Sequence, residues 1–527
     1  MKDNIFTQRM RNDHIWFLKM SLLYGVLFVC CLYRNTSGIT CPVLILSGLG
    51  ISVLFLRRAG IPLQNGTVRY FAGILLLAVS TVRTDSGFLH FFNNVGILLL
   101  FMMSMAHQLY QDQEWGFTDY IKKFFRMLAT WILSVGKIFQ GKNSVDNPAN
   151  SVDNRRITGC ISVENRAKPV DKSVENRKKM TGPILMGILA AALMLLIVLP
   201  LLMMSDEVFS QIFGKIFRLL DPFPLLAKIN IGSIFGIAFT FLFGTVSLYA
   251  FFAGLFRMNL GGKDERKSGR VNVVTGITFT GIMAAVYVLY SAIQILFLFL
   301  RLDTGLPAGV TYSQYAHQGF WQLLAVSLLN FITVLLCAAV FGEDRILKSL
   351  LALISACTCV MILSAAYRMM LYVETYDLTF LRVLVLWFLG VLMVIFCGVI
   401  YFIFRRSFRL FRYITLVVSV GYILFSLARP DALIAGYNLR DAGEMNESDL
   451  CYLIYSLSED AAPHLAEIDC SGAENAWMEK YLDSYFQVID QFDGEMSLRE
   501  WNYSRAAALD AAEKWIGKSP GQQMTQE

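Results

Sequence analysis

The feature that most constrains this chain is the regular alternation of long apolar runs with short charged segments. Of its 527 residues, 56% are hydrophobic and only 16% are charged, whereas a soluble globular chain carries about 25% charged residues. Apolar runs of about 20 residues match the thickness of a bilayer, where a helix satisfies its own backbone hydrogen bonds. The pattern therefore predicts an all-α integral membrane protein embedded in the lipid bilayer.

Eleven apolar runs are candidates for membrane spans. The third and fourth are short for a bilayer core of about 30 Å, so we expect them to be tilted or partly re-entrant. Residues 118–140 alternate basic and apolar side chains, which favours an amphipathic interfacial helix, with a short buried span as the second option. Residues 206–228 form a second interfacial stretch. The predicted spans are 15–33, 41–56, 69–83, 88–106, 183–204, 231–256, 273–300, 320–341, 349–371, 380–404 and 413–428.

Composition divides the chain into four parts. Residues 1–140 form an N-terminal membrane region with about four spans, and residues 181–428 form a membrane core with about seven. Residues 141–180 are polar, lack aromatic side chains and repeat the pattern Ser-Val-Asp/Glu-Asn, which predicts a disordered linker because the segment cannot build a core. Residues 429–527 show helical apolar spacing with few long apolar runs, which predicts a small soluble helical domain.

The positions of Lys and Arg predict the orientation of the chain in the membrane. With eleven spans, the basic clusters within 57–69, 122–126, 257–270 and 405–412 fall on the same side as the basic N-terminus. By the positive-inside rule that side is cytoplasmic, and it also holds the linker. The part from Arg429 to Glu527 contains 7 Lys and Arg against 19 Asp and Glu, and it falls outside. A change of one span would reverse this orientation.

Small residues recur every four positions in the run 231–256, at Gly232, Gly236, Thr240 and Gly244. Such a stripe lets a second helix approach closely. We therefore expect it to have a structural role.

The densest polar stretch in the membrane part lies between two apolar runs, from Ser364 to Arg382. Arg368, Tyr372 and Tyr376 recur every four residues, so they share one face of a helix. An arginine at the bilayer centre costs about 2.5–3.5 kcal/mol and usually reaches the surface or a partner. This stretch is therefore the main candidate for a polar site.

Two other spans contribute candidate polar residues. Asn330 lies well inside its run, where an amide either hydrogen-bonds between helices or lines a substrate pathway. His317 opens the same run and is either an interfacial residue of an aromatic belt or a proton-active group. The complete candidate polar membrane site is Tyr315, His317, Asn330, Arg368, Tyr372, Tyr376 and Arg382.

A second candidate is a boundary motif directly after the last span. Pro430 ends the preceding helix at Arg429, and Asp431, Tyr437 and Asn438 follow at the membrane boundary. We expect these residues to cap and tether the C-terminal helices to the membrane helices. A ligand site at this motif is the alternative.

Several kinds of chemistry lack support in the sequence. The ten cysteines form no CxxC pair, and we find no metal-ligand cluster, no nucleophile with an acid or base at a known spacing, and no nucleic-acid-binding stripe. We therefore predict no metal, no cofactor and no nucleic-acid partner, and we favour a protein that is not an enzyme. Cys451 and Cys470 are either paired, if the C-terminal part lies outside, or free thiols.

The motifs of the C-terminal two thirds resemble those of a bacterial membrane family catalogued as domain of unknown function 4173, related to family 4153. The resemblance runs from about residue 183 to 510 and implies a multi-pass inner-membrane protein of unassigned activity, with no catalytic residue to transfer. Asp377 stands where family members often have glycine. The motifs that carry it are Ser205–Phe209, Tyr312–Gln322, Leu329-Asn330, Ser364–Arg382, Pro430–Asn438, Leu457–Pro463 and Trp501–Arg505.

Two classes of function are compatible with these observations. The first is a non-enzymatic envelope or signalling component whose extracytoplasmic C-terminal domain meets a protein partner. The second is a transporter or membrane-embedded enzyme that uses the polar groups of the spans. In the second class those groups converge on one wet cavity of several hundred Å³, and in the first they pair locally.

Overall fold

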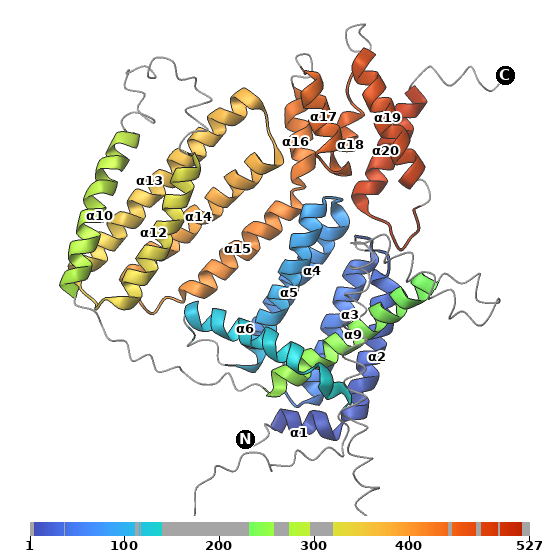
Figure 1. Ribbon diagram of the computed structural model, residues 1–527, viewed down its shortest axis with the longest axis horizontal. Helices are drawn as coiled ribbons and strands as arrows, with labels where there is room; N and C mark the ends of the chain where they lie inside the picture. The colour runs from blue at the N-terminus through green and yellow to red at the C-terminus, as the bar shows by residue number, and fades with distance from the viewer. Residues whose placement is uncertain are drawn as a thin grey trace, which may run out of the picture. The chain divides into compact units, whose positions relative to one another are not determined.

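The computed structural model describes residues 5–35, 37–110, 115, 117–139, 231–257, 273–295, 320–440, 445–470, 476–493 and 496–518. In these ranges the chain forms 17 α-helices and no β-strand (Figure 1). Ten of the helices are long and apolar enough to cross a membrane. The prediction of an all-helical integral membrane protein is confirmed.

The observed helices coincide with ten of the eleven predicted spans, each to within a few residues, except that α13 is extended at both ends. The remaining predicted span at 183–204, the linker at 141–180 and the interfacial stretch at 206–228 lie outside the described residues. The spanning helices are α2 (His14–Leu32), α3 (Thr40–Arg58), α4 (Asn65–Arg83), α5 (Gly87–Leu109), α9 (Ile231–Arg257), α10 (Val273–Gln294), α12 (Phe320–Val340), α13 (Arg345–Tyr376), α14 (Phe380–Phe404) and α15 (Leu410–Leu427).

The helices form two compact units. The first comprises Met1–Tyr33, Arg58–Gly60 and Phe125–Met258, and the second comprises Arg34–Arg57, Ile61–Phe124 and Asn259–Glu527. The amphipathic helix predicted within 118–140 is observed as α6 (Phe117–Leu133), which contributes residues to both units. The four-part division expected from composition stays a prediction.

In the first unit, α2 packs along α9, and α1 (Ile5–Asn12) and the 3₁₀ helix η2 (Val135–Phe139) contact α9. The small-residue stripe lies at the contact between α2 and α9. A Cβ atom at Gly244 would come within 2.8 Å of the Phe28 side chain, and one at Gly236 within 2.9 Å of the Tyr33 ring. Larger residues at these positions would push the helices apart, so the stripe has the close-packing geometry that its spacing predicts.

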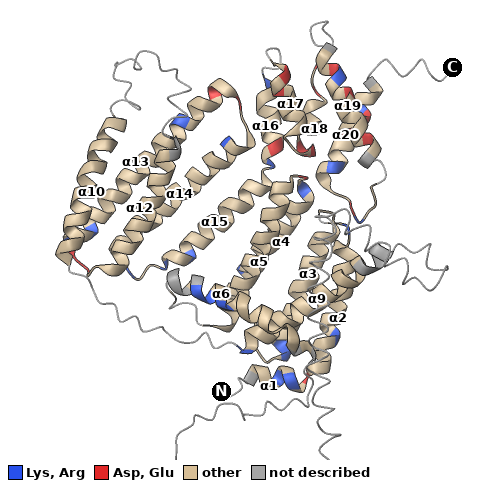
Figure 2. Cartoon of the chain, viewed as in Figure 1, with Lys and Arg blue, Asp and Glu red and all other residues tan. Residues whose placement is uncertain are grey.

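In the second unit, the helices lie side by side in the order α10, α13, α14, α15, α4 and α5, with α12 against α13 (Figure 1). Buried aliphatic and aromatic side chains fill the space between them, among them Val334, Leu389 and Phe396. We call the end of this row that carries the C-terminal helices the domain end, and the opposite end the basic end. The α14–α15 turn at the basic end carries Arg405 and Arg409 (Figure 2).

The C-terminal helices have a core of their own. Leu450, Leu482 and Phe486 are fully buried in it, and a capping box between Asn446 and Asp449 begins α17. Cys451 and Cys470 are free cysteines. The elements are α16 (Pro430–Asn438), α17 (Glu447–Tyr455), the 3₁₀ helix η6 (Glu459–Ala461), α18 (Ala462–Leu465), α19 (Ala476–Asp493) and α20 (Tyr503–Lys518).

Candidate functional site

The candidate residue Asn330 takes part in a hydrogen-bonded group that joins three membrane helices. Its amide oxygen accepts a bond from the Tyr287 hydroxyl of α10 at 2.7 Å, and its amide nitrogen donates to Thr358 Oγ1 of α13 at 2.9 Å. All three side chains are buried. Both functional groups of the amide are thus used between helices, as in the structural alternative for this residue.

Arg368 belongs to a second polar group, between α10 and α13. Gln294 Oε1 accepts a hydrogen bond from Ser364 Oγ at 2.6 Å and one from Arg368 Nη2 at 3.3 Å. The arginine is only 6% exposed. Its contact with Gln294 reduces the cost of placing a cation near the end of a span.

Tyr372, Tyr376 and Arg382 form a third group at the turn between α13 and α14. The Arg382 guanidinium lies 4.4 Å from the centre of the Tyr372 ring, and it donates to the backbone carbonyls of Tyr376 and Asp377. Asp377 has φ 62° and ψ 176°, a conformation that only glycine adopts readily. Asp377 therefore occupies a backbone position that favours glycine.

The described candidate residues of the membrane part therefore form three local groups. Tyr315 and His317 lie outside the described residues. The idea that the whole set serves one polar membrane site stays a prediction.

The boundary motif lies in a much denser network at the domain end. Arg429 precedes Pro430 and has a left-handed backbone conformation with φ 53°. Because the right-handed helical region is disfavoured for a residue before proline, the chain changes direction here between α15 and α16. Its guanidinium forms an ion pair with Asp460, with Nη2 3.0 Å from Oδ1. Asp460 is fully buried, so this pair holds the turn against the C-terminal helices.

Asp460 joins three segments that are far apart in the sequence. Besides Arg429, it accepts hydrogen bonds from Thr84 Oγ1 at 2.5 Å, from the Asp85 backbone N–H at 3.4 Å and from Ser504 Oγ. A buried carboxylate needs such a set of donors and a cation to offset its desolvation. The α4–α5 turn, the α15–α16 turn and α20 are thereby fixed to a single side chain.

Asn502 and Arg505 complete this arrangement. Asn502 Nδ2 lies 3.0 Å from the Thr84 carbonyl and 3.1 Å from the Ser37 carbonyl, so it also ties in the segment before α3. Arg505 Nε donates to Asp85 Oδ1 at 2.8 Å. We call the whole set the junction network, and it consists of Thr84, Asp85, Arg429, Asp460, Asn502, Ser504 and Arg505.

Two other residues of the boundary motif also form hydrogen bonds with other segments. The side chain of Asn438 exchanges two hydrogen bonds with the backbone of Leu378 in the α13–α14 turn, at 3.0 and 2.9 Å. Asp431 is buried and accepts bonds from Ser458 Oγ at 2.6 Å and from the Ser458 backbone at 3.3 Å. Tyr437 instead packs its ring beneath the Arg440 guanidinium, at 5.5 Å. The Asn438 contacts join α16 to the α13–α14 turn, whereas the Asp431 bonds lie within the C-terminal helices, and the tethering role of the motif stays a prediction.

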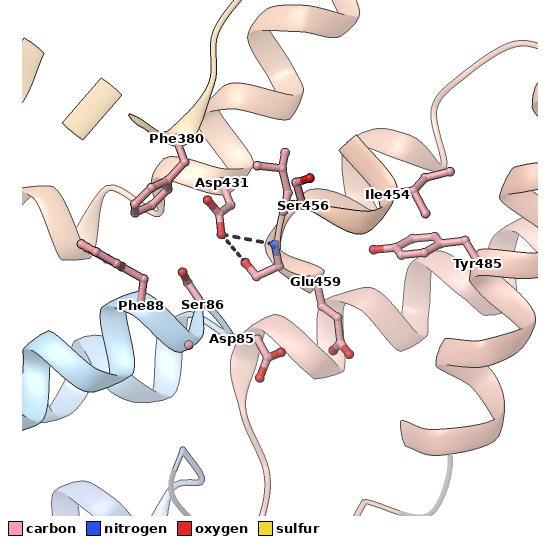
Figure 3. A pocket seen from close by; sticks show the side chains of 12 residues that line it. Asp85, Ser86, Phe88, Phe380, Asp431, Ile454, Ser456, Glu459 and Tyr485 are labelled. Carbon is pink, nitrogen blue, oxygen red and sulfur yellow. Dashed lines mark hydrogen bonds between the residues drawn. The ribbon is translucent and has the colours of Figure 1, made fainter. Parts of the chain in front are cut away.

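A cavity of about 520 Å³ opens beside the junction network (Figure 3). Its lining comes from the α4–α5 turn, the start of α14, α16, the segment from α17 to η6, and α19. Figure 3 shows Phe88 and Phe380 together on one side and Tyr485 on the opposite side. The lining residues are Asp85, Ser86, Gly87, Phe88, Phe380, Asp431, Ile454, Ser456, Leu457, Ser458, Glu459 and Tyr485.

Burial raises the pKa of two acidic groups that line this cavity. It raises the pKa of Asp431 above 3.8, against the lowering effect of the hydrogen bonds from Ser458. It also raises the pKa of Asp85, although the neighbouring Arg505 acts in the opposite direction. Both carboxyl groups therefore lose their protons less readily than exposed aspartates do.

The arrangement provides acidic and aromatic surfaces but not a metal centre. Among the described residues, no three His, Cys, Asp or Glu side chains are close enough together to hold one metal ion. The Ser458 hydroxyl is the one that lies closest to a carboxylate of this lining, donating to Asp431 at 2.6 Å.

Sequence reasoning missed most of the junction network. Only Arg429 was singled out, whereas Asp460, Asn502 and Arg505 were not. The two motifs Leu457–Pro463 and Trp501–Arg505 contain all three of these missed residues. The polar residues within these two motifs, which lie among the C-terminal helices, were the signal that could have identified them.

Comparison with known proteins supports the same assignment of family. Residues 71–468 match the model of a domain of unknown function, DUF4153, the relative named from the sequence motifs. Neither a search of curated proteins nor a search of solved structures gave a match. The matched region is about three quarters of the chain and includes Asp85, Arg429 and Asp460. The chain therefore belongs to the DUF4153 family of multi-pass membrane proteins.

Proposed function

We propose that this protein is a non-enzymatic component of the bacterial cell envelope that presents an extracytoplasmic interaction domain on inner-membrane helices. The observation that carries this proposal is the separation of charge in the second unit. The start of α13 and the segment joining α14 to α15, at the basic end, carry Arg345, Lys348, Arg405, Arg406, Arg409 and Arg412, next to the acids Glu343 and Asp344, whereas the net-acidic helices α17 and α19 lie at the domain end (Figure 2).

The charge separation favours one orientation. Turns rich in Lys and Arg stay in the cytoplasm, so the basic end is cytoplasmic and the domain end is outside. The acidic character of residues 429–527, with 19 Asp and Glu against 7 Lys and Arg, is compatible with export. The N-terminus is then cytoplasmic.

The junction network supports a role in presentation. Asp460 and Asn502 fix the C-terminal helices to the α4–α5 turn, so the domain cannot move freely on a tether. The domain exposes large apolar side chains, with Leu498 at 88% and Tyr455 at 70% exposure. A rigid platform with exposed aromatic and aliphatic groups suits a protein partner.

Cysteine accessibility in intact cells tests the orientation. In a chain with its ten native cysteines replaced, Leu498→Cys is expected to react with a membrane-impermeant thiol reagent, and Ser407→Cys in the exposed α14–α15 turn only after lysis. Labelling in the opposite order would overturn the proposed topology.

Site-specific photocrosslinking tests the interaction. A photoreactive residue in place of Leu498 should give one discrete adduct in living cells, and the same residue in place of Ser407 should not give it. If position 498 yields only the uncrosslinked chain under conditions in which the protein is folded and inserted, the interaction domain is rejected.

A further inference from the structure

We propose that the cavity lined by Asp431, Glu459 and Phe88 is a binding site for an organic ammonium group. This inference goes beyond the proposed function, because it assigns a small-molecule or lipid ligand to the junction. It also holds whichever side of the membrane the C-terminal helices face.

The size and construction of the cavity fit a bound ligand. Its volume of about 520 Å³ lies within the range of about 300–1,000 Å³ that is typical of small-molecule sites. Its walls come from segments that are far apart in the sequence. The ion pair between Asp460 and Arg429, whose charged atoms are 3.0 Å apart, holds these segments together. The cavity is thus a lasting feature of the folded junction.

The charge of the walls selects for a cation. Three lining residues are acidic, Asp85, Asp431 and Glu459, and none is Lys, Arg or His. The hydrogen bonds that Asp431 accepts come from the neutral donors of Ser458. Asp85 forms an ion pair with Arg505 at 2.8 Å, but the lining itself has three acids and no basic residue, so it disfavours anions.

Aromatic rings select for an organic cation. Phe88 and Phe380 pack edge to face with their centres 4.9 Å apart, and Tyr485 lies on the opposite side of the cavity (Figure 3). Rings of this kind attract an alkylammonium group within about 6 Å of their centres. In the described part of the chain the carboxylates are too far apart to form a metal site. The ligand must therefore be large enough to contact both the acidic side chains and the rings, and it must carry an apolar part.

Two sources could supply this group. The cavity includes Gly87 and Phe88 at the start of membrane helix α5, close to where lipid headgroups lie, and it also opens beside the C-terminal helices. A quaternary or primary ammonium could therefore belong to a lipid headgroup or to a free amine. Both share the same contacts with Asp431, Glu459 and the rings.

Choline chloride is a suitable probe for the full-length protein in an uncharged maltoside detergent. Titrated choline should raise the thermal unfolding temperature saturably, relative to sodium chloride at equal ionic strength. The neutral isostere 3,3-dimethylbutanol should give no such shift. Equal effects of choline, its neutral isostere and sodium chloride would reject the proposal.

Matched variants locate the binding. Glu459→Gln and Asp431→Asn should each weaken choline binding by about tenfold or more, whereas Glu467→Gln, an exposed acid of the same domain outside the lining, should bind like the wild type. Ser456→Lys, at an exposed lining position, places a tethered ammonium at the cavity and should block choline without removing an acid. Unchanged affinity in this folded variant contradicts the site.

Nanodiscs distinguish the two sources. If a lipid headgroup is the ligand, phosphatidylcholine discs should abolish the response to free choline, and phosphatidylglycerol discs should retain it. If a free amine is the ligand, both discs should retain the response. Loss of the response in both discs and in detergent would overturn the proposal.

Discussion

Two buried polar clusters of the second unit differ in composition and in reach. The cluster around Asn330 joins Tyr287 and Thr358 with neutral groups, all within the membrane helices. The junction network instead centres on the Asp460 carboxylate and joins segments separated by up to 420 residues. Neutral amides contribute modestly to helix packing in membranes, whereas an ion pair removed from water is costly to break. Of the two clusters, we therefore expect the junction network at the domain end to contribute more to the stability of the fold.

Removal of the Asp460 carboxylate tests that comparison most severely. Asp460→Ala leaves Arg429, only 15% exposed, without its buried counter-charge, and we expect a loss of about 3–5 kcal/mol in unfolding free energy. The C-terminal helices should also become sensitive to protease while the membrane helices stay protected. Limited proteolysis and thermal unfolding of the purified protein measure both effects.

The control for this variant is Glu467→Ala, at an exposed position of the same domain. It should change neither the protease pattern nor the unfolding temperature. If Asp460→Ala behaves like this control, the junction network does not hold the domain.

Removal of the Asn330 amide should have a smaller effect. Asn330→Leu deletes the bonds to Tyr287 and Thr358, and we expect a loss of about 1 kcal/mol, typical of a hydrogen bond between membrane helices. Thr278→Val is the matched control, because the Thr278 hydroxyl is exposed and bonds to the Val274 carbonyl of its own helix. A loss for Asn330→Leu as large as that for Asp460→Ala would remove the contrast between the two clusters.

The sequence could predict the helices because each apolar run must bury itself or face lipid, whatever its partners are. The helices of the C-terminal domain were also predictable from the spacing of residues such as Leu482 and Phe486. The junction network was not, because Thr84, Asp460 and Asn502 meet only through the tertiary fold. Arg368 stood out in sequence since it lies in a span, yet its partner Gln294 lies 74 residues earlier in another helix, so the sequence could not identify it.

The turn between α13 and α14 offers a test at the membrane surface. Asp377→Gly should stabilise the protein by about 1 kcal/mol, because glycine adopts φ 62° and ψ 176° without the strain of a side chain. Asp377→Ala removes the carboxylate but keeps the Cβ atom, so it should give no comparable gain. Equal unfolding temperatures of the Gly and Ala variants would show that the backbone conformation is not the cause.

The smallest expected effect is a dependence on pH at Asp431. Its pKa is raised by burial above 3.8, so the folded state binds a proton more tightly than the unfolded state. The stability that this tighter proton binding contributes is fully present below pH 3.8, the ordinary value of an aspartate, and is lost as the pH rises through the raised pKa of Asp431. Asp431→Asn cannot ionise, but its amide oxygen can still accept a bond from Ser458.

The variant should therefore gain stability relative to the wild type as the pH rises from about 4 to about 8. Unfolding temperatures of the two proteins at matched ionic strength measure the trend, and Glu467→Gln, at an exposed position outside the cavity lining, serves as the control. Asp460 lies near enough to raise the pKa of Asp431 as well, so the same series in the Asp460→Asn background should show a weaker trend. A difference between Asp431→Asn and wild type that falls with pH would mean that hydrogen bonds from Ser458 outweigh burial at this carboxylate.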